Sequence, residues 1–222
     1  WIIIRAEAKA IPFFPLIAVR LAVFGVSYFT LGPQVGGEPL QVLYLQRKYG
    51  LTYTRATASV FMDKLLEFLA NFFLLAVGLT SIFQAGVISR NAGNPLVSLS
   101  GLVILFLWPP VHILLMARGI YPLSMLLRKI SHSKFTRFIS ACEHMAGTFC
   151  RRHFSALFAA IGVSLLAALG MVSEYFLITS FLHIDLGFSQ TVAAWTAGWL
   201  AFLVPLPGGL GALEASQVFA LG

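Results

Sequence analysis

Residues 154–182 read FSALFAAIGVSLLAALGMVSEYFLITSFL, an apolar run of 29 residues in which Glu174 is the one charged side chain. An α-helix needs about 20 such residues to cross roughly 30 Å of hydrocarbon. Residues 57–84 and 96–117 form two further apolar runs of that length. Outer-membrane barrels have alternating segments of about ten residues, and this sequence has no such pattern. We therefore predict an all-α, polytopic transmembrane helix bundle that forms a single domain over residues 1–222.

The composition supports a membrane protein. Charged residues make up 10% of the chain, hydrophobic residues make up 59%, and the mean hydropathy is +0.87. Soluble domains carry roughly 25% charged residues, and a water-soluble globule with so few could not cover this much apolar surface. The sequence contains no Ser/His/Asp nucleophile elbow, nucleotide-binding loop or Rossmann fingerprint. We therefore expect no enzyme activity and no cofactor.

The basic residues predict the topology. Seven of the 15 Lys and Arg residues lie between Arg118 and Arg152, together with one acid, Glu143, and no Lys or Arg follows in the next 70 residues. Because positive charge beside membrane spans marks the cytoplasmic side, we place residues 118–153 in the cytoplasm. The loops 85–95 and 183–189 then lie outside. We interpret the net charge of +7 as a topology signal and expect no nucleic-acid partner.

Two segments combine a short apolar run with a Gly/Pro turn. Residues 31–39 (LGPQVGGEP) and 205–214 (PLPGGLGALE) both contain Pro, Gly-Gly and Glu, and such turns cannot continue a helix. We predict broken or re-entrant hairpins over 10–46 and 191–222. The three spans between them would place the hairpins on opposite faces, an inverted pair typical of a transporter's central site. The alternative is that these glycines only permit close helix packing.

The loop 118–153 is predicted to contain an amphipathic helix that lies on the inner leaflet. Its apolar stripe comprises Phe135, Phe138, Ile139, Cys142, Met145, Ala146 and Phe149. We also expect Pro109-Pro110 to kink or break the 96–117 span. Cysteines and histidines in this loop do not match a standard zinc spacing, so we predict no metal site.

The segments 31–50, 58–66 (ASVFMDKLL) and 206–214 (LPGGLGALE) resemble the lysylphosphatidylglycerol synthase transmembrane family, also called the flippase-like domain family. The resemblance covers nearly the whole chain and implies a bacterial inner-membrane domain that translocates a lipid. Gln41 stands where the family often has Arg, and Asp63-Lys64 where it often has Asp-Arg. Lys keeps the charge of Arg but lacks its bidentate fork. The resemblance does not extend to a soluble aminoacyl-transferase domain.

The candidate substrate-binding residues are polar groups at membrane depth and turn residues of the two interrupted segments. They are Arg20, Gly36, Gly37, Glu38, Asp63, Lys64, Glu67, Glu174, Pro207, Gly208, Gly209, Gly211 and Glu214. Glu38 and Glu214 either contact a cationic headgroup, carry a proton, or cap free backbone N–H groups. Lys64 and Glu67 are spaced to pair on a helix.

The sequence leaves two roles open for the Arg20 side chain. It binds a lipid phosphate, or it pairs with Glu38 or another acid, for which Glu174 is a candidate.

The leading functional hypothesis is a multi-pass protein of the bacterial inner membrane that flips a polar-headgroup lipid through a cavity between the two hairpins. The alternative is the membrane module of a lipid-linked transferase or synthase with its catalytic domain elsewhere, and a third is a structural scaffold. The chain begins at Trp1 without a Met and stops at Gly222 inside an apolar run, so we expect a longer protein. The expected partner is a membrane phospholipid or another polar-headgroup lipid. A homo-oligomer and a soluble transferase partner stay open.

Overall fold

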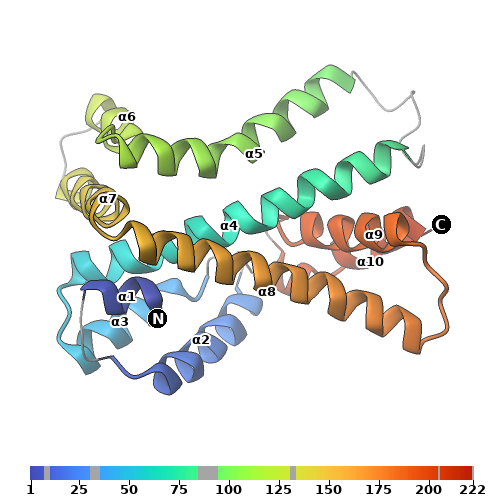
Figure 1. Ribbon diagram of the computed structural model, residues 1–222, viewed down its shortest axis with the longest axis horizontal. Coiled ribbons are helices and arrows are strands. Elements are labelled where there is room, and N and C mark those ends of the chain that lie inside the picture. The colour runs from blue at the N-terminus through green and yellow to red at the C-terminus, as the bar shows by residue number, and fades with distance from the viewer. Residues whose placement is uncertain (8–10, 31–35, 85–94, 131–133, 205, 222) are drawn as a thin grey trace. The chain divides into compact units, whose positions relative to one another are not determined.

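The computed structural model describes residues 1–7, 11–30, 36–84, 95–130, 134–204 and 206–221, and all regular elements in these ranges are helical (Figure 1). The helices are α1 Ile2–Glu7, α2 Phe13–Tyr28, α3 Glu38–Tyr49, α4 Tyr53–Gln84, α5 Pro95–Ala117, α6 Pro122–Ile130, α7 Lys134–Arg152, α8 Phe154–Phe181, α9 Phe188–Ala201, the 3₁₀ turn η1 Pro207–Gly209, and α10 Ala212–Leu221. The predicted all-helical class is confirmed.

The predicted apolar runs correspond to helices. The run 57–84 lies in α4, which begins four residues earlier, and 96–117 and 154–182 match α5 and α8 to within one residue at each end. Residues 85–94 of the predicted loop 85–95, and residues 31–35 of the 31–39 turn, lie outside the described residues. Of the expected kink or break at Pro109-Pro110, the break is wrong, because α5 continues through both prolines, and the kink stays a prediction. Proline removes few helical hydrogen bonds, and neighbouring packing compensates for them in membrane helices.

Within the described part of the chain, α8 is the one helix both long and apolar enough to cross a membrane, with shorter apolar helices at Phe13–Tyr28 and Phe106–Ala117. Large apolar side chains stand exposed along α8, including Leu166 at 70% and Phe181 at 81%. Water would penalise such a surface, whereas lipid would not. The crossing of the bilayer by α4, α5 and α8 stays a prediction.

The chain divides into two compact units. The first unit comprises residues 1–23, 38–69 and 107–163, and the second comprises 24–37, 70–106 and 164–222.

The core of the first unit contains the apolar face of α7. Ala146, Phe149 and Cys150 are buried in one cluster with Met62 of α4 and Met116 of α5. We expected this face to lie on the inner leaflet, and that expectation is wrong for these residues. An amphipathic pattern shows that one face of a helix is removed from water. Apolar side chains of the protein can cover that face as well as lipid can.

The second unit contains the Gly/Pro turn between α9 and α10. These two helices pack together, and the Gln217 side-chain amide of α10 donates to the Ala194 carbonyl of α9 at 2.9 Å. Gly208, Gly209 and Gly211 all have positive φ, between 62° and 78°, a conformation that other residues adopt with strain. The predicted interruption near residue 207 is therefore confirmed, and the inverted relation of the two hairpins stays a prediction.

The Gly208→Ala variant should unfold at lower temperature than the wild type. A Cβ built on Gly208 would lie 2.9 Å from Cε1 of Tyr28, and the φ of 62° adds strain. Together these effects should cost about 1–2 kcal/mol. Thermal unfolding in detergent measures the change. Gly25→Ala in α2 is the matched control, because its Cβ would meet no atom within 4 Å, and an equal loss of stability in both variants would contradict the prediction.

The two native cysteines should not react with a thiol reagent in the folded protein. Both lie buried in α7, and burial raises the pKa of the Cys142 and Cys150 thiols to about 11. Because the thiolate is the reactive form, neither should react with a maleimide at pH 7.5 until the protein is denatured.

The unreactive native cysteines allow the topology to be tested with introduced ones. Lys134→Cys should be labelled only from the cytoplasmic side and Asp185→Cys only from outside. Labelling of position 134 by an impermeant reagent in intact cells would contradict the topology.

Candidate functional site

Five charged side chains from three helices of the first unit form one ion-pair network, which we call the charged cluster. Its members are Arg20 of α2, Glu38 of α3, and Asp63, Lys64 and Glu67 of α4. The three α4 residues lie within five positions, so two helix turns present their side chains together. All five were predicted site residues, and the structure brings them together.

Arg20 holds two carboxylates at once. Its Nη1 lies 2.6 Å from Oδ2 of Asp63, and its Nη2 lies 2.6 Å from Oε2 of Glu67. Asp63 and Glu67 share a face of α4 at i and i+4, as predicted, so one guanidinium fork reaches both. Arg20 therefore pairs with acids in this structure, although neither Glu38 nor Glu174 is among its ion pairs. Binding of a lipid phosphate by Arg20 stays a prediction.

Lys64 lies between two further carboxylate oxygens. Its Nζ is 3.0 Å from Oε2 of Glu67, which confirms the predicted pair, and 3.2 Å from Oε1 of Glu38. Lys64 and Glu38 side chains are each 14% exposed, whereas those of Arg20 and Asp63 are 37% and 39% exposed. The cluster thus has an enclosed end at Lys64 and an open end at Arg20.

Two buried acceptors on α3 have no hydrogen-bond donor among the residues that the structure describes. They are Oε2 of Glu38 and the side-chain oxygen Oε1 of Gln41. The two residues are three positions apart, so they lie on one side of the helix. A buried acceptor without a donor costs about 1–3 kcal/mol, so these oxygens favour a ligand that brings N–H or O–H groups. We had named Gln41 as a departure from the family pattern but not as a site residue. The spacing of three residues between Glu38 and Gln41 is the sequence signal that would have identified Gln41 as a site residue.

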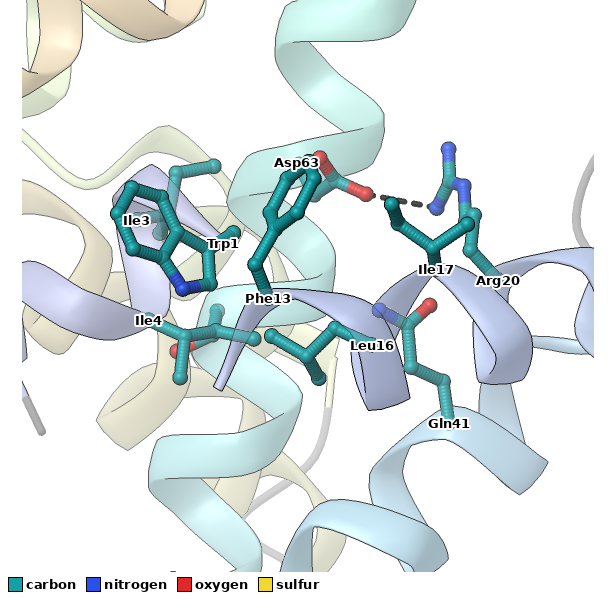
Figure 2. Close-up of a pocket in the computed structure, with 10 residues that line it drawn as sticks. Trp1, Ile3, Ile4, Phe13, Leu16, Ile17, Arg20, Gln41 and Asp63 are labelled. Atoms are coloured by element: carbon teal, nitrogen blue, oxygen red, sulfur yellow. Dashed lines mark hydrogen bonds and ion pairs between the residues drawn. The ribbon is translucent and has the colours of Figure 1, made fainter. Parts of the chain in front are cut away.

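A cavity of about 180 Å³ opens beside this cluster, within the first unit (Figure 2). Figure 2 shows the Arg20–Asp63 ion pair on one side of it and Trp1 with Ile4 on the other. Its lining residues are Trp1, Ile3, Ile4, Phe13, Leu16, Ile17, Arg20, Gln41, Ser59 and Asp63. One wall is therefore apolar and the other is polar or charged, a combination that suits the junction between a lipid's headgroup and its tails.

The remaining predicted residues lie in the second unit. Glu214 is exposed, and its Oε2 accepts from the Gly211 backbone N–H at 2.8 Å, as a glutamate does at the third position of a helix that it caps. Glu174 is exposed on α8. The Gly37 N–H donates to Oγ of Ser27 at 2.7 Å, and a Cβ on Gly36 would overlap the Thr30 side chain. Pro207, Gly208 and Gly209 form the turn η1.

The chain was compared with known proteins. No curated protein and no solved structure shows significant similarity to it. The family model described as lysylphosphatidylglycerol synthase TM region matches residues 1–222. Since that match spans every residue of the chain, the protein is a member of the lysylphosphatidylglycerol synthase TM region family.

Proposed function

We propose that this protein translocates a polar-headgroup lipid across the bilayer and holds the headgroup at the charged cluster. The family is that of a membrane region of lipid-handling proteins. The observation that carries the proposal is the pair of unpartnered buried acceptors, Glu38 Oε2 and Gln41 Oε1, beside an amphipathic cavity and a network of exchangeable ion pairs.

The cluster suits a headgroup that carries both a phosphate and a donor group. Its three carboxylates and two cations leave one excess negative charge. A phosphate can take the place of Asp63 or Glu67 on Arg20, because phosphate and carboxylate both accept from the guanidinium fork. The released carboxylate, with Glu38 and Gln41, then accepts from an ammonium or hydroxyl group. Exchange of partners avoids leaving any buried charge uncompensated.

A protein site is needed because a bare headgroup in hydrocarbon is costly. Each unmet hydrogen bond there costs several kcal/mol. The apolar wall, which includes Trp1 and Ile4, lets acyl tails stay in an apolar environment while the headgroup contacts the cluster. We place this transport in the bacterial inner membrane, with a membrane phospholipid as the substrate class.

The second candidate is a membrane module of a lipid-linked synthase. The family description, which names a synthase, favours it. In that case the same cluster binds the lipid made by a catalytic domain elsewhere, and the purified chain moves no lipid by itself. The two hypotheses therefore differ in one measurable property.

The test is a headgroup-accessibility assay in proteoliposomes of the purified chain, with fluorescent phospholipids and a membrane-impermeant quencher. We expect quenching of inner-leaflet lipid to be at least tenfold faster than in protein-free vesicles. Lys64→Met should lose this activity, since it removes the cation between Glu38 and Glu67. Lys48→Met is the matched control, because Lys48 is exposed on α3 outside the cluster. Binding of lipid without acceleration would favour the synthase module.

A further inference from the structure

Helix α6 is fixed to the first unit through its inner side. The carboxylate of Glu143, which is 1% exposed, accepts from the backbone N–H groups of Leu123 at 3.0 Å and Ser124 at 2.7 Å. It also accepts from the Ser124 hydroxyl. One buried carboxylate thus satisfies free donors in the first turn of α6. Because Glu143 holds one side of α6, the opposite side of the helix faces away from Glu143.

The other side of α6 exposes apolar side chains. Met125 is 60% exposed and Leu126 is 58% exposed, and Lys129 stands exposed about one turn further on. Figure 1 shows α6 beside α7 at the end of α5. Two large apolar side chains next to a lysine are typical of a helix at a membrane surface, where the apolar groups enter the acyl boundary and the lysine reaches the headgroups.

The sequence around α6 carries an excess of positive charge, which favours anionic lipids. Residues 118–152 contain seven Lys and Arg and one acid, Glu143. That acid is buried and occupied by α6, so it does not face a membrane surface. Exposed cations in this stretch are Arg118, Lys129, Lys134, Arg137, Arg151 and Arg152. Such an excess attracts anionic phospholipids.

We propose that α6 is the interfacial helix of this protein, with Met125 and Leu126 inserted at the acyl boundary and Lys129 bound to anionic phospholipid headgroups. This role differs from the one expected for α7, the buried face of which lies in the core. It is also separate from the charged cluster, since none of its residues belongs to that cluster or lines the cavity. The two proposals can therefore fail independently.

The test places a polarity-sensitive fluorophore on Leu126→Cys in the full chain, with Cys142 and Cys150 buried and unreactive. The protein is reconstituted in nanodiscs of phosphatidylcholine alone or with 30% phosphatidylglycerol. We expect quenching by headgroup-labelled spin lipids to be at least threefold stronger with phosphatidylglycerol. Lys129→Glu should remove that difference. Arg47→Glu is the matched control, because Arg47 is exposed on α3, and it should leave the difference intact.

Two results would overturn the proposal. One is a fluorophore quenched by aqueous iodide and not by spin lipids, which would place α6 in water or against another protein. The other is equal lipid quenching in both nanodiscs, which would show membrane contact without recognition of anionic headgroups.

Discussion

Arg20→Met is expected to reduce lipid translocation at least tenfold and to lower the unfolding temperature. The substitution removes the guanidinium that bridges Asp63 and Glu67, whose carboxylates both lie 2.6 Å from its nitrogens. Three carboxylates would then face the single ammonium of Lys64. Because Arg20 and Asp63 are each more than a third exposed, solvent screening reduces the loss of stability to about 1–2 kcal/mol. The transport defect should therefore exceed what unfolding explains.

Two further variants separate charge balance from headgroup binding. Arg20→Lys keeps the charge but cannot bridge both acids with a planar fork, so we expect intermediate transport. Arg20→Met combined with Asp63→Asn restores the charge balance and should recover the unfolding temperature without recovering transport. Thermal unfolding and the vesicle assay measure the two properties. Normal transport by the double variant would show that Arg20 only neutralises its neighbours.

Glu38→Gln should also reduce translocation at least tenfold, whereas Glu214→Gln should retain most of the activity. Glu38 is 14% exposed, forms an ion pair with Lys64 and has a second oxygen without a donor. Glutamine at position 38 removes the negative charge from the ion pair with Lys64 and from the oxygen that is proposed to accept from the headgroup. Glu214 is exposed and accepts one backbone N–H at 2.8 Å. Glutamine keeps that acceptor, so the cap should survive.

This contrast revises the expectation drawn from sequence, in which Glu38 and Glu214 shared the same alternative roles. The vesicle assay on both single variants distinguishes the roles, with Glu214→Ala as the variant that removes the cap itself and lowers stability by roughly 1 kcal/mol. Equal and severe loss of transport in both Gln variants, with normal unfolding temperatures, would restore a charge role for Glu214.

The helices and their interruptions were predictable from the sequence. The length of an apolar run such as 154–182 predicts a long helix, because about 20 apolar residues span the hydrocarbon. The turn PLPGGLGALE predicts an interruption, because Pro and Gly restrict or loosen the backbone locally. The Lys64–Glu67 pair is equally local, because one helix turn separates the two residues. The helix does not break at Pro109-Pro110, which shows that the energy of surrounding packing can outweigh a local signal.

The partners of Arg20 and the cover of each amphipathic helix were decided by tertiary structure. Arg20 lies 43 residues from Asp63 and 47 from Glu67, and no periodicity connects positions on different helices. The patterns of α6 and α7 are both amphipathic, yet α7 packs into the core and α6 exposes Met125 and Leu126. Sequence determines which side chains avoid water, because that depends on their own chemistry. Only the folded chain determines which neighbour covers them, because that depends on how the helices pack.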